Sequence, residues 1–453
     1  AEGAKAHPQL LEEFGGLYAG PQAAYVTRIG RTVAAQSGLA AAPSEFTISL
    51  LNSSVNNAFA IPGGYVYVTR QLMVLMNNEA ELASVLGHEV GHIAARHSQK
   101  RNAKASRAGL GAILATVLGG VLLGDNGARL GQQLGSALAQ RYVLSYSRAQ
   151  EYEADDLGIR YLARSGYEPL AASTMLASLA SQTALDARRD GRNDKALPEW
   201  ASTHPDPASR VVRARQKASQ MVPQGRQTNR EAFLQMLDGI IYDDDPQQGI
   251  VEGRSFQHPG LRLAFTAPPG YVMSNGSKAV SINGAGGQAQ FSAGPYQGDL
   301  DAYLGRVFRS VGGQTQLAYS APRRTVVNGL PTSYAIARAN TSSGPVDVTV
   351  FAYEFGPTQA YHLVAITRAG AAPFEGLFQS VRRLSAEEAG NIRPRRIAIT
   401  TVKAGDTVAS LATKMAYTDY QIERFRVLNG LAEAEGLRPG QKVKLVTFAA
   451  SSK

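Results

Sequence analysis

The sequence changes its pattern close to residue 225, and this change constrains the fold more than any other feature. From Glu2 to Ser37 and from Gln71 to Gln220, apolar residues recur three and four positions apart, which indicates amphipathic helices. After Val222 to Gly225, β-branched and aromatic runs are separated by glycine pairs, which is typical of strands and turns. We therefore expect a mainly helical domain followed by a β-rich region.

The fold class is expected to be multidomain, because the chain has 453 residues and a typical domain has about 150. The first domain, residues 1–225, is expected to be mainly helical. The second, residues 246–386, is expected to be an antiparallel α+β domain. The third, residues 397–447, follows a basic linker and has the order strand, helix, helix, strand.

Alternation and turn residues place the elements of the second and third domains. In the second, strands are expected at Leu261–Phe265, Ala279–Ile282, Gln288–Ser292, Thr332–Ala337, Val346–Phe355 and Ala360–Thr367, and helices at Leu300–Val311 and Pro373–Leu384. In the third, strands Ile397–Val402 and Lys442–Val446 bracket helices near Thr407–Met415 and Asp419–Leu428. The second domain carries no motif, so a docking or regulatory role follows from its position alone, and His258 and His362 are expected to be structural.

Composition excludes several kinds of site. The chain has no cysteine, which excludes disulfides, thiolate zinc sites and cysteine nucleophiles, and any metal must be held by His and carboxylates. This composition suits an oxidising compartment, and a first residue Ala1 instead of Met predicts an exported protein whose signal peptide has been removed. The most apolar run, Leu110 to Gly124, is broken by glycines and is too short to span a membrane.

The net charge of +10 arises from 46 Lys and Arg against 36 Asp and Glu. Such a charge favours anionic surfaces, although the basic residues are spread along the chain. The sequence lacks the interleaved aromatic and basic residues of single-strand binders, so no nucleic-acid partner is expected.

A candidate metal motif lies in the helical run Glu79 to His97. His88 and His92 are four residues apart, so their side chains leave one helix face about 40° apart and can reach the same ion. Zinc accepts two neutral imidazoles and a carboxylate and leaves a fourth position for water, whose pKa it lowers to about 7. Glu89 can then take a proton from that water. The alternative is a chance match on a surface helix.

A second helical segment supplies the missing carboxylate. Glu151 and Asp155 are four residues apart, so Glu151 can complete a zinc site while Asp155 accepts the other ring N–H of a ligating histidine. The alternative is a solvated acidic helix. A third histidine ligand six residues after His92 is excluded, because position 98 is Ser. His97 is rotated about 140° from His92 on a continuous helix and is expected to form only local hydrogen bonds.

Four blocks resemble a known family, the zinc metallopeptidases that include CAAX prenyl endopeptidases, HtpX-type proteases and the periplasmic protease BepA. The blocks are Asn57–Gly64, His88–His97, Ser147–Gly158 and Ser202–Arg210, and the resemblance covers about Leu17 to Ala218. It implies a zincin-type domain that holds one Zn²⁺ per chain and acts as a metalloendopeptidase. The implied ligands are His88, His92 and Glu151, with Glu89 as general base and Asp155 behind the ligands.

The resemblance also implies that His204 and Arg210 face the metal cleft. His204 would either donate to the developing oxyanion or sit on the zinc and hold the enzyme latent. The alternative for His204 is a helix-cap residue before Pro205.

The resemblance further implies a strand that pairs with an extended substrate. The residues concerned are Gly64, Tyr65, Val66, Tyr67 and Val68, in an edge strand that ends at Thr69, with Phe46–Leu51 as a partner strand. Relatives commonly carry Gly before the next Leu, where this chain has Arg70 and Gln71, so these two side chains are expected to alter the substrate groove.

Residues 102–150 are rich in Gly, Ala and Leu. Asp125 is their one acidic residue, and Glu151 follows directly after them. We expect a helical hairpin packed on the catalytic core. The alternative is a lid, or a surface that contacts a membrane or an unfolded client.

The C-terminal region resembles a LysM domain. The Gly405–Thr407 turn, Asn429–Gly430 and Pro439–Gly440 fall where that βααβ fold turns. The resemblance implies binding to N-acetylglucosamine polymers such as peptidoglycan. The alternative is a module that makes protein contacts only.

Together these patterns predict an exported zinc endopeptidase of a bacterial envelope, periplasmic or associated with the cell envelope, that acts on misfolded or misassembled proteins. The expected partners are polypeptide substrates, peptidoglycan, the outer-membrane assembly machinery and a peripheral membrane surface. The rival class is a latent protease in which His204 closes the zinc site and client binding is the main activity.

Overall fold

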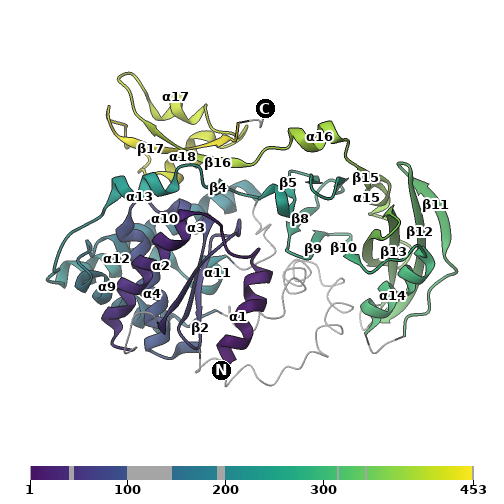
Figure 1. Cartoon of the computed structure of the whole chain (residues 1–453), viewed down its shortest axis with the longest axis horizontal. Coiled ribbons are helices and arrows are strands. Elements are labelled where there is room, and N and C mark those ends of the chain that lie inside the picture. The colour runs from purple at the N-terminus through teal and green to yellow at the C-terminus, as the bar shows by residue number, and fades with distance from the viewer. Residues whose placement is uncertain are drawn as a thin grey trace.

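A computed structural model describes residues 2–39, 45–98, 145–190, 199–313, 316–341 and 344–450 (Figure 1). The helical hairpin expected over residues 102–150 lies outside these ranges up to residue 144, and residues 148–150 begin the helix that continues to Arg164. Within them, no helix has both the length and the apolarity needed to cross a membrane.

The first domain is built on a three-stranded sheet between helices. The strands are β1 (Thr47–Leu51), β2 (Ala58–Ile61) and β3 (Tyr65–Thr69), in the order β1-β3-β2. Helix α1 (Glu2–Glu13) covers one face, where Leu10 and Phe14 pack in a cluster with Phe59 and Tyr67. Helices α2 (Pro21–Ala34) and α4 (Glu79–Ala94) cover the other face, so the metal-motif helix is packed directly on the sheet.

The expected edge strand proves to be the central one. Strand β3 pairs with β1 in parallel and with β2 in antiparallel fashion, and Val66, Tyr67 and Val68 are fully buried. Its backbone is therefore occupied on both sides, and the prediction that residues 64–68 pair with a substrate is wrong. Alternation reveals a strand but not how many neighbours it has, and here the tight turn at Gly63–Gly64 folds β2 back onto β3.

This region contains further helices, several of which pack on the metal-motif helix. They are α3 (Arg70–Leu75), α9 (Arg148–Arg164), α10 (Ala171–Asp190), α11 (Trp200–Thr203), α12 (Pro207–Gln220) and α13 (Arg230–Leu237), together with a 3₁₀ turn at Ala35–Ser37. Helix α9 begins at a capping box, in which Ser147 and Gln150 each accept the other's backbone N–H. The helix thus starts about one turn before Glu151 and about two turns before Asp155.

Glycines allow α4 and α9 to approach closely. A Cβ atom added at Gly158 of α9 would lie 2.9 Å from the backbone nitrogen of His88, and one added at Gly91 of α4 would lie 3.0 Å from the carbonyl oxygen of Ala154. These neighbours are backbone atoms of the packed helices and cannot move aside as a flexible side chain can. The two helices that carry the candidate ligands therefore meet backbone to backbone.

The middle region forms two antiparallel sheets. The seven-stranded sheet has the order β11-β12-β13-β14-β10-β9-β8, and the four-stranded sheet has the order β15-β7-β6-β5. The strands are β5 (Ile250–Glu252), β6 (Ser255–His258), β7 (Leu263–Thr266), β8 (Val272–Asn275), β9 (Ala279–Gly284), β10 (Gly287–Gly294), β11 (Arg323–Val327), β12 (Leu330–Thr341), β13 (Gly344–Gly356), β14 (Gln359–Arg368) and β15 (Arg382–Arg383). A 3₁₀ turn, Pro246–Gln248, precedes them.

Alternation along β13 and β14 divides the larger sheet into two apolar faces. Val348 and Val350 pack with α14 (Leu300–Gly312), whereas Phe351 and Tyr353 pack with the smaller sheet and α15 (Glu375–Ser380). The expected strands are all present, but the helix predicted from Pro373 to Leu384 is wrong in its second half. The chain leaves α15 after Ser380 because residues 382 and 383 pair with β7.

The C-terminal region has the predicted strand, helix, helix, strand order. After α16 (Ala386–Asn391) come β16 (Arg395–Thr401), α17 (Val408–Ala412), α18 (Gln421–Leu428) and β17 (Lys442–Phe448). Strand β4 (Ile241–Tyr242), which follows the first domain, adds to the outer side of β16. The C-terminal sheet thus contains a strand contributed from about 150 residues earlier, and Figure 1 shows this unit seated on the first domain.

The C-terminal unit shares one hydrophobic core with the first domain. Leu411, Phe425 and Val443 belong to the same buried cluster as Leu72 and Leu86. The buried amine of Lys444 donates to the carbonyl oxygens of Val74 at 2.7 Å and Met76 at 2.6 Å, at the C-terminal end of α3. The C-terminal unit is therefore packed as part of the first domain and is not an independent domain joined only by a linker.

The first prediction concerns the contact between α4 and α9. Gly158→Ala should lower the free energy of unfolding by about 1–3 kcal/mol, because the added methyl group overpacks a backbone contact. The matched control is Gly390→Ala in α16, where an added Cβ meets nothing within 4 Å and stability should stay unchanged or rise by up to about 1 kcal/mol. Chemical denaturation of both variants would measure the difference, and equal stabilities would contradict the tight packing.

The second prediction concerns Lys444. Lys444→Met should lower the free energy of unfolding by about 2–4 kcal/mol, because it leaves two buried carbonyl oxygens without a donor. The control is Lys442→Met on the same strand, which breaks an ion pair to Glu231 whose carboxylate is 72% exposed and should cost less than about 1 kcal/mol. Thermal unfolding of the full chain would compare them, and a loss no larger than in the control would refute a structural role for Lys444.

Candidate metal centre

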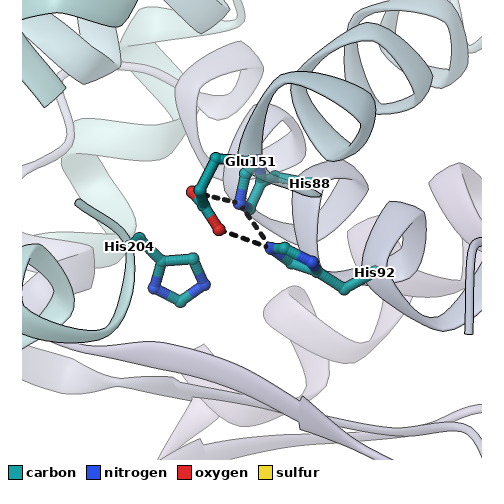
Figure 2. Close-up of side chains that lie close together, drawn as sticks. All are labelled: His88, His92, Glu151 and His204. Carbon is teal, nitrogen blue, oxygen red and sulfur yellow. Dashed lines mark hydrogen bonds and ion pairs between the residues drawn. The ribbon is translucent and has the colours of Figure 1, made fainter. Parts of the chain in front are cut away.

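Helix α4 places three functional side chains in one buried site. Asn78 caps the helix by accepting the backbone N–H of Glu81. Two and a half turns later, His88, Glu89 and His92 are all buried. The Nε2 atoms of His88 and His92 lie 3.0 Å apart, as expected for the i and i+4 positions of one helix face (Figure 2).

Helix α9 brings a carboxylate to the same point. The Oε1 atom of Glu151 lies 3.0 Å from Nε2 of His92, and its Oε2 atom lies 3.4 Å from Nε2 of His88 (Figure 2). The Glu151 side chain is fully buried. The sequence prediction that these residues of two separate helices converge therefore agrees with the geometry.

The donor atoms fit a zinc ion. Zinc takes imidazole nitrogens and carboxylate oxygens at about 2.0–2.2 Å in a tetrahedral arrangement, which separates neighbouring donors by about 3.3 Å, close to the three distances given above. Neither carboxylate oxygen of Glu151 forms a hydrogen bond of acceptable geometry, although both are buried. Besides the histidines, Oε2 of Glu151 is contacted by the Arg210 guanidinium at 2.7 Å. A buried carboxylate among imidazole nitrogens is costly, and a divalent cation between them would offset this cost.

His204 supplies a fourth donor. It closes the short helix α11 through its backbone N–H, which donates to Trp200, so the cap interpretation is correct for its main chain. Its imidazole, however, belongs to the metal site: His88, His92, Glu151 and His204 each offer a donor atom within 4.8 Å of the others. The imidazole stacks on the Trp200 ring, with the ring centroids 4.5 Å apart and the planes inclined by 7°. Its Nε2 atom lies 3.2 Å from Oε1 of Glu89.

Arg210 and Asp155 lie behind the ligands. The Arg210 guanidinium donates twice to Asp155, at 2.8 and 2.7 Å, and its Nη1 lies 2.7 Å from Oε2 of Glu151. Asp155 Oδ1 in turn lies 2.9 Å from Nδ1 of His88, which fixes that nitrogen as the ring donor and leaves Nε2 free. Arg210 thus contacts carboxylates and orients them.

The electrostatics of the site favour a cation between the histidines. Burial alone would lower the pKa of His88, but Glu151 and Asp155 outweigh it and raise the pKa to about 10. Burial lowers the pKa of His92, which keeps that imidazole neutral, as a metal ligand must be. Burial would raise the pKa of Glu151, yet His204 and His88 hold it below its usual range, so the carboxylate is ionised.

The structure places several other residues that the motif analysis misjudged or missed. Arg70 and Gln71 do not face the metal site: Arg70 donates to Asn52 and to the Ile241 carbonyl oxygen, and Gln71 donates to Asp243. They join the first domain to the segment that follows it. Aromatic rings line the site without having been predicted, namely Tyr146, stacked on His92 at 3.7 Å, and Trp200. Their signal was an aromatic residue shortly before each of the two later motif blocks.

Comparisons with known proteins agree with this geometry. Residues 21–218 match the model of "Peptidase family M48", and residues 400–446 match the model of the LysM domain. The beta-barrel assembly-enhancing protease of Escherichia coli O157:H7 is 33% identical over 46% of this chain and 42% of its own length. That of Yersinia pestis is 36% identical over 44% of this chain and 39% of its own length.

A eukaryotic relative is similar over a comparable share of this chain. The mitochondrial metalloendopeptidase OMA1 of Schizosaccharomyces pombe is 31% identical over 42% of this chain and 51% of its own length. The chain spans less than half of the length of the two bacterial relatives. The chain accordingly carries a metallopeptidase domain of family M48 over residues 21–218, followed by a LysM domain over residues 400–446.

Proposed function

We propose that this chain is a zinc-dependent endopeptidase. The observation that carries the proposal is the buried convergence of His88, His92 and Glu151 beside the carboxylate of Glu89. His88, His92 and Glu151 would hold the zinc. When bound, zinc supplies a Lewis acid that polarises a peptide carbonyl and lowers the pKa of a water molecule.

Glu89 is suited to move the proton of the attacking water. Its side chain is fully buried on the helix that carries the two histidines, and neither of its oxygens accepts a hydrogen bond of good geometry. A carboxylate in this position can take a proton from water and pass it to the leaving amine. His204, 3.2 Å from Glu89, stands where it could donate to the oxygen of the attacked carbonyl.

An extended substrate would pair with β2 and not with β3. Strand β2 is an edge of the sheet and packs against α4, which carries the histidines and Glu89. Two residues before this strand, the carbonyl oxygen of Asn56 accepts the backbone N–H of Trp200 at 2.7 Å, so this edge is tied to the segment that holds His204. A peptide added to β2 would gain main-chain hydrogen bonds and run along the metal helix.

A latent form of the enzyme is the second candidate. Catalytic zinc sites keep one position open, whereas four protein donors make a closed site. His204 belongs to the set of four donors, which supports a state in which it closes the site and the chain binds clients without cutting them. The position of its ring between Trp200 and Glu89 is compatible with either role.

We further propose action at the bacterial envelope on misfolded or misassembled proteins. The bacterial relatives are named for enhancing β-barrel assembly, and the LysM match supports a glycan such as peptidoglycan as a partner. The absence of cysteine suits an oxidising periplasm. The net charge of +10 would favour anionic envelope surfaces.

The third prediction tests the reaction. Wild type should cleave an unfolded protein such as casein, and Glu89→Gln should lose at least about 100-fold in rate while it keeps its zinc, because it loses the general base. Gel assays with zinc content measured in each preparation would show this. If the wild type does not cleave casein but His204→Ala does, the latent form would be supported. If none of the three proteins cleaves casein although each has zinc bound, the peptidase proposal would be rejected in favour of a binding protein.

The fourth prediction tests whether Arg210 positions Glu151 for zinc binding. Arg210→Lys should weaken zinc binding by roughly 10-fold or more, because one ammonium cannot bridge the two carboxylates as the guanidinium does. The control is Arg213→Lys on the same helix, whose partner Asp156 lies outside the metal site. Zinc dissociation constants from competition with a chelating dye would compare them. Equal affinities in both variants would show that Arg210 does not position Glu151.

A further inference from the structure

The chain makes an abrupt turn immediately after the metal-motif helix. Helix α4 ends at Ala94, and Ala95 closes it with its backbone N–H. Arg96 then adopts a φ of 56°, in the left-handed region that costs a non-glycine residue about 1–2 kcal/mol. Strain of this kind persists only where the surroundings hold it. Its result is that His97 turns back towards the ligands and does not continue round the helix.

His97 is fully buried against the ligand His92. The Nδ1 atoms of the two rings lie 2.8 Å apart, and the ring centroids are 5.0 Å apart. On its far side, the Nε2 atom of His97 lies 2.8 Å from Oε2 of Glu153. Glu153 stands two residues after Glu151 on α9. A continuous row of hydrogen bonds therefore runs from the metal site through two imidazoles to a carboxylate.

The row permits only one arrangement of protons if His92 holds a metal. The Nε2 atom of His92 faces Glu151 and His88, so it must carry no hydrogen, and the hydrogen of the neutral ring must be on Nδ1. His92 then donates to Nδ1 of His97, whose own hydrogen must be on Nε2, where it donates to Glu153. Every nitrogen has a partner of the right kind, and the row ends on an acceptor that cannot donate when ionised.

The two ligand histidines are thus supported by different groups. His88 is held through Nδ1 by the buried Asp155, which Arg210 holds in turn. His92 is held through Nδ1 by His97, and the last member, Glu153, has a side chain that is 53% exposed. Stacking of Tyr146 on His92 fixes the plane of the ring but leaves its two tautomers equal, so the tautomer must be chosen by a hydrogen bond.

We propose that His97 and Glu153 are positioning residues that hold His92 in its metal-binding tautomer. We call Glu153, His97 and His92 the relay. The left-handed backbone of Arg96 turns the chain so that His97 faces His92. This inference rests on the metal site of the proposed function. It adds that the affinity for zinc depends on a carboxylate outside the group of ligands, at the surface of the protein.

The fifth prediction concerns the zinc dissociation constant of the full chain. His97→Phe should weaken zinc binding roughly 10- to 100-fold, the usual effect of losing a hydrogen-bond partner of a ligand. His97→Gln should keep most of the affinity, because its amide can accept from His92 and donate to Glu153 at the same time. Glu153→Ala should weaken binding by about 10-fold. Competition with a chelating dye measures all three, and Co²⁺ absorption spectra report whether the ligand geometry has changed.

The control is Asp156→Ala, which removes another carboxylate of α9 that pairs with Arg213 and Lys217 and contacts no histidine of the site. Its zinc affinity should stay within about twofold of wild type, since an ion pair of this exposure contributes little. If His97→Phe does not fold, Glu153→Ala against Asp156→Ala decides the matter, because Glu153 is half-exposed. Equal zinc affinities of wild type, His97→Phe and Glu153→Ala would overturn the relay alone. A wild type that binds no zinc would overturn the proposed function and the relay together.

Discussion

The backbone contact between α4 and α9 is the constraint on which the site depends. Two histidines on one helix reach a carboxylate on another only if the helix axes lie unusually close, and side chains at the crossing would prevent this. Gly91 and Gly158 remove the obstacle, at a cost in helix propensity of about 1 kcal/mol for each glycine. The surrounding core repays this cost because α4 is buried along almost its whole length.

Close packing of this kind concentrates charge where water cannot reach it. Glu89, Glu151 and Asp155 lie within one buried cluster, and each ionised carboxylate loses hydration worth several kcal/mol. Arg210 offsets part of the loss by contacting two of them, and a divalent ion would offset more. Metal binding and folding of this region are therefore coupled, because the same ligands that hold the ion are destabilising without a cation.

Sequence periodicity predicted what depends on local spacing and failed where the chain leaves a regular element. The pairing of His88 with His92, and of Glu151 with Asp155, follows from four-residue spacing on helices. His97 was assigned to the wrong face because that argument assumes a helix that continues past Ala94, whereas a left-handed residue ends it. The central position of β3 and the docking of Lys444 depend on partners distant in the sequence, which alternation within a strand cannot reveal.

The pairing of Tyr242 with Arg395 across β4 and β16 gives the chain an unexpected topology. The chain enters the middle region after β4 and comes back from it into β16, the strand that pairs with β4. The middle region is therefore an insertion between two neighbouring strands of one sheet (Figure 1). Its two connections are side by side and act as a single stem. The M48 and LysM domains consequently form one structural body with a shared core, despite the 181 residues that separate their matched ranges.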